Sequence, residues 1–182
     1  MKKIKISGET WLEDIINYGI IYLDNSISVK NLLKNEKVLP CTRCSKTKGK
    51  VGEEALPKDF YVSSQNLQFY SWCEKNKLKY GILSDMYGMH FWNEKKKFYD
   101  IHPSSLTDDD FERLGKLIRE KMITNSFDSF LFWNSSPLMS APYFYMMKLS
   151  GLKIFYITKL YPLVKETSSL LQWKRTGGYK KW

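Results

Sequence analysis

The sequence predicts an α/β fold with a mostly parallel central sheet of about four strands and with helices on both faces. Two observations lead to this prediction. Four short apolar runs can form strands, and segments with helical periodicity lie between them. Parallel strands connected through helices are covered on both faces of their sheet. The four runs are residues 37–41, 78–84, 126–133 and 152–160.

The elements before the first run are short. Residues 2–6 alternate between polar and apolar side chains, which is typical of a strand. Residues 8–19 predict a helix, and residues 28–35 predict a second one. The first 35 residues could form an N-terminal extension of the domain. The apolar face of the first helix carries Trp11, Ile15 and Ile16.

Two later helices are marked by their N-caps. Residues 63–76 predict a helix that Ser63 or Ser64 caps. Residues 105–123 predict the clearest helix of the chain, with Thr107 as its N-cap and three Asp residues in its first turn. The inward faces are expected to carry Leu67, Tyr70 and Cys73 in the first helix, and Phe111, Leu114, Leu117 and Ile118 in the second.

The remaining segments connect these elements. Residues 89–100 predict a hairpin or an extended excursion that turns at Asn93-Glu94. Residues 135–151 predict a loop and a helix that begins at Ser140 and ends before Gly151. A helix and then a basic, aromatic tail are expected after the last run. The single domain is expected to span residues 1–172 and the tail residues 173–182.

The charge balance favours a polyanionic partner. The chain has 182 residues and a net charge of +10, from 29 Lys and Arg against 19 Asp and Glu. Because cations that meet phosphates release condensed counterions, a nucleic acid or a nucleotide fits this balance. A Lys-rich surface without a specific partner is the alternative explanation.

Other features of the composition bear on location. No apolar run approaches the ~20 residues that cross a bilayer, and the charged start is not followed by the apolar stretch of a secretory signal. Three cysteines, an odd number, do not suit a disulfide framework. We therefore expect a cytoplasmic protein without a membrane partner.

The functional crevice of a parallel sheet lies at the carboxyl ends of its strands. One of these ends is the basic segment 41–50, in which Cys41 and Cys44 have the spacing of a zinc pair. A closed zinc site needs two such pairs, and the rest of the chain offers only single residues, so neither zinc nor an iron–sulfur cluster nor another cofactor is expected. The cations favour an anion-binding loop and would lower the pKa of either thiol. An exposed, flexible loop is the alternative. The four ends are residues 41–50, 84–90, 134–141 and 158–162.

Polar side chains also follow the second run. Ser84, Asp85, Tyr87 and His90 occur together there. A carboxylate could activate water or hold a hydroxyl, a Tyr could stack on a base, and a His could move a proton at neutral pH. A glycine turn capped by the Asp is the simpler alternative.

Further candidates follow the third run and end the chain. Asn134 and Ser136 come before a helix, where an anion could bind. Asp100 and His102 lie in a loop and predict no site. The tail alternates cations with Trp and Tyr, which suits base stacking with phosphate pairing, although a disordered basic end explains it equally well. The cations of the tail are Lys174, Arg175, Lys180 and Lys181.

Four motifs in the stretch from Cys44 to Asp100 carry a resemblance. They are Cys-x3-Lys, Leu-Pro-x-Asp-x-Tyr-x-Ser, Leu-Ser-x-x-Tyr-Gly and Tyr-Asp, and in this order they resemble a little-characterised family of small α/β domains. That family is distantly similar to the Cys/Lys-containing domain of archaeosine synthases, which modify deazapurine bases in tRNA. Its fold is similar to that of uracil-DNA glycosylases. The motifs fall on Cys44 and Lys48, residues 56–63, residues 83–88 and Tyr99-Asp100.

Two further stretches echo motifs of the glycosylase fold. Residues 85–87 resemble its Asp-Pro-Tyr, and residues 136–138 resemble the end of its His-Pro-Ser-Pro-Leu loop. Asn134-Ser135 stands where the catalytic His of that loop would be, so the resemblance does not imply glycosylase activity.

The resemblance and the charge together imply a nucleic-acid base-modification enzyme or subunit. Its substrate would be a purine or deazapurine base, in RNA, especially tRNA, rather than DNA. The alternatives are a non-catalytic nucleic-acid-binding module and a partner subunit of a larger modification enzyme. The expected roles are catalysis for Cys44, Lys48 and Asp85, base binding for Lys46, Ser84, Tyr87, Asn134 and Ser136, and backbone binding for Arg43 and the cations of the tail.

Overall fold

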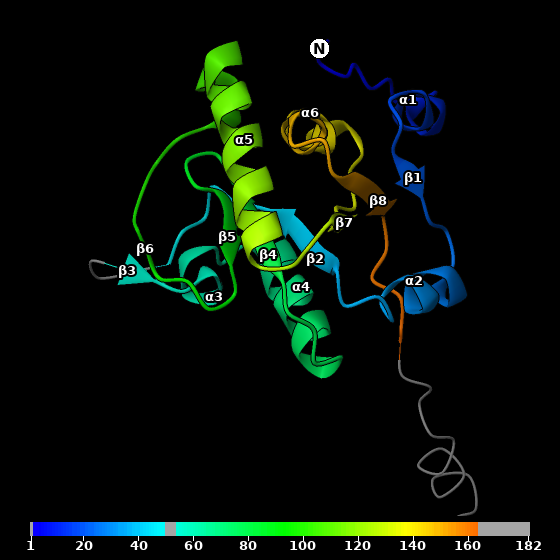
Figure 1. The fold of residues 1–182 in the computed structure, drawn as a ribbon, viewed down its shortest axis with the longest axis horizontal. Helices are drawn as coiled ribbons and strands as arrows, with labels where there is room; N and C mark the ends of the chain where they lie inside the picture. Colours follow the sequence, from blue (N-terminus) through cyan, green and yellow to red (C-terminus); the bar gives the residue numbers. More distant parts are fainter. Residues whose placement is uncertain (1, 50–53, 164–182) are drawn as a thin grey trace, which may run out of the picture.

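The chain folds around a mixed, mostly parallel sheet, which confirms the predicted α/β class (Figure 1). The computed structural model describes residues 2–49 and 54–163. The strands of the main sheet are β1 (Ile21–Tyr22), β2 (Val38–Arg43), β4 (Gly81–Ser84), β5 (Gly88–Phe91), β7 (Ser129–Trp133) and β8 (Lys153–Ile157). Their order is β1-β8-β7-β2-β4-β5, and only β5 runs antiparallel to its neighbour. The four predicted strands thus form the centre, and a short strand is added at each edge.

Helices lie on both faces of this sheet. They are α1 (Trp11–Asn17), α2 (Ser26–Leu32), α3 (Pro57–Phe60), α4 (Ser64–Lys75), α5 (Asp108–Thr124) and α6 (Ala141–Leu149). α5 and α6 pack against each other, and α4 packs against β2. A small antiparallel pair, β3 (Glu54–Ala55) with β6 (Lys96–Lys97), lies outside the main sheet. None of the helices in the described residues is both long and apolar enough to cross a membrane.

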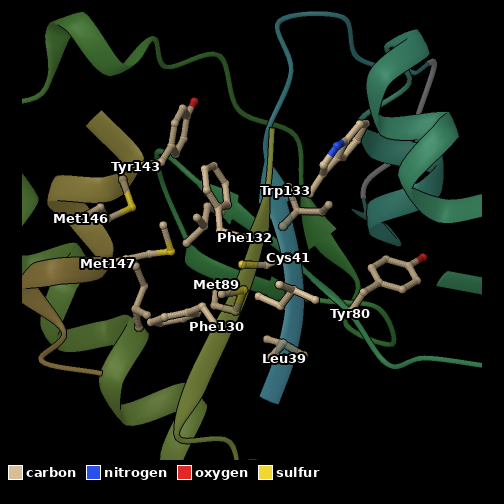
Figure 2. Close-up of a cluster of buried hydrophobic side chains, with 14 of the residues drawn as sticks. Leu39, Cys41, Tyr80, Met89, Phe130, Phe132, Trp133, Tyr143, Met146 and Met147 are labelled. Carbon is tan, nitrogen blue, oxygen red and sulfur yellow. The ribbon is translucent and has the colours of Figure 1, made fainter. Parts of the chain in front are cut away.

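Adjacent side chains of β7 show how two helical layers meet the sheet. Phe132 packs edge-to-face against Phe144 of α6, with ring centroids 5.5 Å apart. The next residue, Trp133, stacks on Phe69 of α4 at 5.9 Å. Because successive side chains of a strand point to opposite faces, α6 and α4 cover opposite faces of the sheet. Figure 2 shows the same division, with Met146 of α6 on one side of the strands and Trp133 on the other.

The helical layer of α5 and α6 depends on two local features. The Thr107 side chain accepts a hydrogen bond from the Asp110 N–H, and the Asp110 carboxylate accepts one from the Thr107 N–H. This capping box starts α5 where the sequence predicts it. A Cβ atom on Gly115 would lie 2.5 Å from the Leu149 Cβ, so glycine is needed for the close approach of the two helices.

The predicted strand over residues 2–6 is wrong. This segment lies against α5 instead, where Ile4 is buried and Lys3 pairs with Asp108 at 2.6 Å. The edge of the sheet is formed by Ile21–Tyr22, which pairs in parallel with β8. A two-residue strand is too short to produce a period in the sequence. The first 35 residues therefore supply both an edge strand and part of the core.

Of the two alternatives predicted for residues 89–100, the hairpin is wrong, whereas the extended excursion agrees with the structure, in which the Glu94 N–H donates to the Phe91 carbonyl in a turn. β5 pairs with the preceding strand β4, and residues 85–87 form the turn between them. Residues 96–97 pair with Glu54–Ala55 instead. The segment after Ser84 is therefore a tight hairpin turn rather than a crossover to the next parallel strand.

Two positions predicted to face inward are exposed. Ile16 is 54% exposed and Leu67 is 51% exposed. In α4 the inward stripe carries Phe69 and Cys73, because Phe69 has to meet Trp133 of the sheet. The rotation of this helix is thus set by its largest ring contact, which periodicity alone does not identify.

Candidate functional site

The carboxyl ends of the parallel strands meet at one edge of the sheet, as the sequence predicts. Arg43 at the end of β2 is in register with Leu83 of β4, and Trp133 at the end of β7 is in register with Ile157 of β8. A pocket of about 780 Å³ lies beside this edge, which is a usual size for a small-molecule site. Its walls include Arg43, Cys44, Lys46, Lys48, His102 and Tyr143.

Cys44 and Asp85 form the polar centre of the site. They are the first residues after β2 and β4, so the pairing of these strands brings them together. The Cys44 thiol donates a hydrogen bond to Asp85 Oδ2 at 3.0 Å. The hydroxyl of Tyr143, from the first turn of α6, lies 3.4 Å from the same sulfur. Cys44 and Asp85 are only 4% and 2% exposed, so these contacts are made away from bulk water.

Asp85 is a buried carboxyl whose hydrogen bonding is incomplete. Its Oδ1 has no hydrogen-bond partner among the described residues. Burial raises the pKa of the Asp85 carboxyl, and the Cys44 thiol and the charge of Lys48 oppose this rise only in part. A buried acceptor without a donor costs about 1–3 kcal/mol. Asp85 itself does not line the pocket, and its Oδ1 is a buried acceptor behind Cys44, which does.

Cys44 is not the low-pKa thiol that the sequence predicts. Burial, followed by the charge of Asp85, raises the pKa of Cys44 to about 12. Lys48 acts in the opposite direction, but its effect is smaller than that of burial. Burial in the core also raises the pKa of Cys41. At neutral pH, Cys44 is therefore an S–H donor and not a thiolate.

Lys48 is held over aromatic rings beside the pocket. It forms an antiparallel bridge with Tyr61, so the basic segment is ordered here and does not form the free loop that was the alternative. The Lys48 Nζ lies 5.0 Å from the ring centre of Tyr61 and 4.9 Å from that of Tyr99, and it donates to the Ser45 carbonyl. Burial lowers the pKa of Lys48, while neighbouring acidic groups raise it again.

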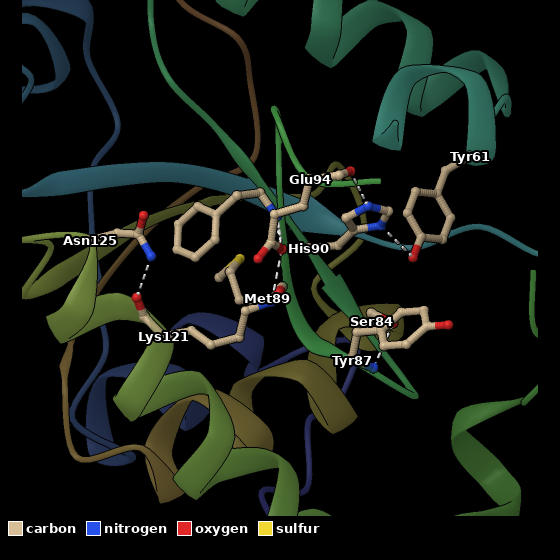
Figure 3. A network of polar contacts seen from close by, with 9 residues as sticks. Tyr61, Ser84, Tyr87, Met89, His90, Glu94, Lys121 and Asn125 are labelled. Atoms are coloured by element: carbon tan, nitrogen blue, oxygen red, sulfur yellow. Dashed lines mark hydrogen bonds and ion pairs between the residues drawn. The ribbon is translucent and has the colours of Figure 1, made fainter. Parts of the chain in front are cut away.

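A hydrogen-bonded chain runs from Ser84 into the β4–β5 hairpin. Ser84 Oγ donates to the Tyr99 hydroxyl at 2.8 Å, and the hydroxyls of Tyr99 and Tyr61 are 3.2 Å apart. Tyr61 Oη lies 3.3 Å from His90 Nδ1, and His90 Nε2 lies 2.8 Å from the Glu94 carbonyl oxygen. Figure 3 shows His90 between Tyr61 and Glu94. The two rings that hold Lys48 are thus fixed from behind by this chain.

The direction of each hydrogen bond in this chain follows from its far end. A carbonyl oxygen can only accept, so His90 Nε2 carries the proton and Nδ1 accepts from Tyr61. Tyr61 then accepts from Tyr99, and Tyr99 accepts from Ser84. Burial lowers the pKa of His90 to about 4, which keeps the imidazole neutral at physiological pH.

The structure brings together some of the predicted site residues. Cys44, Lys48 and Asp85 converge, and Lys46 lies on the pocket rim. Tyr87 does not join them, because its hydroxyl donates to the Lys97 carbonyl at 2.8 Å. Ser84 and His90 belong to the buried chain, and Ser84 lies behind Tyr99.

Asn134 and Ser136 take a different place from the one expected. Asn134 is completely buried and accepts a hydrogen bond from Gln65 Nε2 of α4 at 2.8 Å. The Ser136 N–H donates to the same Asn134 oxygen. Neither residue lines the 780 Å³ pocket. The predicted backbone contacts Lys174, Arg175, Lys180 and Lys181 lie outside the described residues.

Sequence reasoning missed several residues of this site. Tyr143 contacts the Cys44 sulfur, and Gln65 bonds Asn134. Asp100 and His102 line the pocket, although the sequence predicts a loop without a site there. Only Tyr143 could have been identified from the sequence: it follows a proline in the first turn of a helix, and that helix begins at the carboxyl end of a strand. Its apolar surroundings in the sequence instead indicate a core residue.

The two cysteines of the zinc-like pair do not share a centre. Cys44 contacts Asp85 and Tyr143. Cys41 instead lies near Cys73 of α4. Burial raises the pKa of Cys73, and Cys41 adds to that rise. Across residues 2–49 and 54–163, no group of three His, Cys, Asp or Glu residues could hold a metal ion.

Comparisons of the chain with protein-family models, curated proteins and solved structures give no match. The resemblance carried by the four motifs therefore stays a prediction. The function of the site has to be inferred from its own contacts and charges.

Proposed function

We propose that this chain is a nucleic-acid base-modification enzyme that binds a purine or deazapurine base of RNA, in particular of tRNA, in the pocket beside Cys44. The contact between Asp85 and Cys44 carries the proposal: Cys44 and Lys48 line that pocket, and the Asp85 carboxylate lies directly behind the Cys44 thiol. The base would present its N–H groups to Asp85 and its face to the surrounding rings.

The hydrogen-bonding capacity of Asp85 supports this proposal. Enzymes that act on a base bind it outside the duplex and recognise its pairing edge through hydrogen bonds. The edge of a guanine-type base carries adjacent N–H donors, and an ionised carboxylate can only accept. Asp85 Oδ1 could accept one of these N–H groups while Oδ2 keeps the Cys44 thiol. Tyr143 would add an aromatic contact at the same wall.

The pKa shifts support chemistry at the base. The pKa of Asp85 is raised and that of Lys48 is lowered, in both cases by burial, so both shift toward neutrality. Such opposite shifts are typical of acid–base pairs in catalytic sites. Asp85 could take a proton from an N–H of the base, and Lys48 could give one to a base oxygen. This exchange would change the tautomer available for modification.

The charge of the pocket supports an RNA substrate. Arg43, Lys46 and Lys48 line it, and the chain as a whole has a net charge of +10. Phosphates flank every base of an RNA strand, so cations at the mouth could bind the backbone while the base lies inside. The three cysteines are free and buried, which suits a reducing compartment, and we place the activity in the cytoplasm.

A non-catalytic base-binding module is the second candidate. The raised pKa of Cys44, about 12, favours it, because a thiol that stays protonated is a poor nucleophile. In that case the pocket would bind the base and a larger modification enzyme would carry out the reaction.

A binding experiment tests the shared part of both candidates. Isothermal titration calorimetry would measure the dissociation constants of guanosine and uridine for the wild-type chain and for Asp85→Asn. We expect guanosine to bind more tightly than uridine, and Asp85→Asn to weaken guanosine binding about 10- to 100-fold. Tyr87→Phe is the matched control, since that hydroxyl bonds Lys97 outside the pocket, and it should bind as wild type. Equal affinities of wild type and Asp85→Asn for guanosine would refute a base-binding role.

A second experiment separates the enzyme from the module. tRNA is incubated with the protein and an undialysed cell extract, digested to nucleosides, and analysed by mass spectrometry. A mass change that wild type produces and Lys48→Gln does not would support catalysis. Asp85-dependent binding without any mass change would support the module.

A further inference from the structure

We propose that a phosphate group binds where Arg43, Gln65 and Asn134 meet, so that the site takes a nucleotide rather than a free base. The identity of the ligand rests on the proposed function, because the phosphate would belong to the nucleotide whose base lies beside Cys44. The sequence suggests two roles for Asn134, contact with the base and anion binding, and this proposal assigns it the second.

Three side chains from three elements form a hydrogen-bonded row at this place. Arg43 ends β2, Gln65 lies in the first turn of α4, and Asn134 follows β7. Arg43 Nη2 donates to Gln65 Oε1 at 3.4 Å, and Gln65 Nε2 donates to Asn134 Oδ1 at 2.8 Å. The Ser136 N–H donates to the same Asn134 oxygen at 3.2 Å. Both amide oxygens of the row are therefore already accepting hydrogen bonds.

The atoms of the row that are left over are donors. Asn134 Nδ2 and Arg43 Nε have no hydrogen-bond partner in the part of the chain that the structure describes. Asn134 is 0% exposed, so water does not surround its free N–H group. A buried donor without an acceptor costs about 1–3 kcal/mol, which a ligand oxygen would recover.

The guanidinium of Arg43 also lacks a negative partner. Its two hydrogen bonds are long, 3.4 Å to Gln65 and 3.5 Å to the Cys44 carbonyl, and both acceptors are uncharged. Among the described residues, no carboxylate forms an ion pair with it. A partly buried Arg with weak, neutral contacts is free to form the short, charge-assisted bonds that it makes with phosphate.

The start of α4 adds a favourable field. This helix has 12 residues, and the Ser63 side chain caps the Asn66 N–H. The N–H groups of Ser64 and Gln65 have no acceptor within the helix, and its positive dipole end lies here. Asn66 Nδ2 donates to the Arg43 carbonyl at 3.0 Å, which fixes the helix start against β2. Together with the free amide of Asn134, this is a setting in which helices bind phosphate.

Arg43 connects this place to the base pocket. It lines the 780 Å³ pocket together with Cys44, the next residue in the chain. Burial raises the pKa of Tyr143, and the nearby charge of Arg43 partly opposes that rise, so the guanidinium and this pocket ring interact. A base beside Cys44 and a phosphate at Arg43 can therefore belong to one nucleotide.

The opposite end of the sheet provides the contrast and a control. A pocket of about 560 Å³ there is also lined by lysines, including Lys37 and Lys79. α4 and α5 end beside this pocket, so the negative ends of two helix dipoles border it. Lys37→Gln removes one positive charge, as Arg43→Gln does, at an end of the sheet where an anion is not favoured.

The experiment compares ligands with and without a phosphate on the same folded proteins. Isothermal titration calorimetry would measure the dissociation constants of guanosine, guanosine 5′-monophosphate and inorganic phosphate for wild type, Arg43→Gln, Asn134→Asp and Lys37→Gln, with thermal unfolding as a check on each variant. We expect the monophosphate to bind wild type at least about tenfold more tightly than guanosine. Arg43→Gln should remove this advantage, measured as the ratio of the two dissociation constants within the variant, and Lys37→Gln should keep the wild-type ratio. Because Asn134→Asp buries a carboxylate and could unfold the chain, Arg43→Gln decides the test.

Each outcome bears on one proposal. Competition between inorganic phosphate and the monophosphate, seen only in proteins that keep Arg43, would support the phosphate site. If guanosine did not bind in that case, the base-binding proposal would fail and the phosphate site would stand. Asp85-dependent guanosine binding without any Arg43-dependent phosphate effect overturns the phosphate site and leaves the base pocket intact. Equal losses in Arg43→Gln and Lys37→Gln reduce the effect to general charge and also overturn it.

Discussion

Two polar regions lie at the same edge of the sheet, and they differ in how completely their hydrogen bonds are made. In the chain from Ser84 through Tyr99 and Tyr61 to His90, every proton has an acceptor and the direction of each bond is fixed. Around Asp85 and the Arg43 row, by contrast, Asp85 Oδ1, Arg43 Nε and Asn134 Nδ2 have no partner among the described residues.

We interpret the difference as one between a supporting region and the proposed binding region. Buried polar groups in folded proteins are almost always hydrogen-bonded, so a group without a partner needs an explanation. The complete chain stabilises the fold and holds the rings beneath Lys48. The incomplete region costs stability and offers acceptor and donor atoms to a ligand. Changes in the first region should therefore affect mainly the free energy of unfolding, and changes in the second mainly ligand binding.

The largest expected effect is a loss of stability in acid, because protonation of His90 breaks the hydrogen-bonded chain that runs from Ser84 to His90. The pKa of His90 is lowered by burial from 6.5 to about 4, so between these values the unfolded state binds more protons than the folded state. Neutral His90 therefore contributes to the free energy of unfolding above pH 6.5. This contribution, on the order of 3 kcal/mol, is lost as the pH falls from 6.5 toward 4. Urea unfolding at pH 7 and pH 4.5 measures this loss.

Variants of the two histidines isolate the effect. His90→Gln cannot gain the proton, so its free energy of unfolding should fall less between the two pH values than that of wild type. The exposed His102 is the matched control, and His102→Gln should retain the wild-type dependence. Glu94, Lys96 and Lys121 also act on the pKa of His90, but they are present in all three proteins. The same pH dependence in wild type and His90→Gln would contradict the assignment.

A smaller loss is expected when one hydroxyl is removed from the middle of the chain. Tyr99→Phe leaves Ser84 without its acceptor and Tyr61 without its donor, and it should lower the free energy of unfolding by about 1–3 kcal/mol. Tyr87→Phe removes the same atom from a half-buried ring whose hydroxyl bonds the Lys97 carbonyl of the short strand β6, and it should cost less than about 0.5 kcal/mol. If urea unfolding gave equal losses for Tyr99→Phe and Tyr87→Phe, the hydrogen-bonded chain would add no stability beyond that of a single hydroxyl bond.

The same contrast explains why the sequence predicted the fold better than the site. The four central strands and the capping box at Thr107 are local patterns, since apolar runs and N-cap residues act over a few positions. The two-residue strand β1 has no such pattern, because it is defined only by its pairing with β8. The rotation of α4 also depends on a distant residue, the Trp133 ring.

For the site, the rule about strand ends placed Cys44 and Asp85 together correctly. The pKa of Cys44 was predicted in the wrong direction, because neighbouring cations are visible in the sequence whereas burial is not. Gln65 and Tyr143 were missed for a related reason: each reaches the site from a helix whose inward face is set by tertiary packing. Hydrogen bonds that are left unmade cannot be read from a sequence at all.

The smallest expected change in stability concerns the centre of the incomplete region. Asp85→Asn keeps the shape of the side chain and an oxygen that can accept from Cys44, and it removes a buried carboxyl whose pKa is raised. Because a raised pKa means that the folded state disfavours the charged form, the wild-type carboxyl weakens the fold as the pH rises above 3.8 toward its folded value. At pH 7, the free energy of unfolding of Asp85→Asn should therefore lie within about 1 kcal/mol of the wild-type value or above it. Proteins often gain stability when a group that serves function rather than folding is removed.

A small change in the free energy of unfolding would separate the two regions most clearly, because the same substitution should weaken guanosine binding strongly. The loss of the Lys48–Asp85 attraction acts against the gain, and Lys48→Gln measures that contribution separately. If Asp85→Asn instead destabilised the protein as much as Tyr99→Phe does, Asp85 would be a structural group like those of the complete chain. A small effect on unfolding together with a large effect on binding would mean that Asp85 Oδ1 is kept without a protein partner for its ligand.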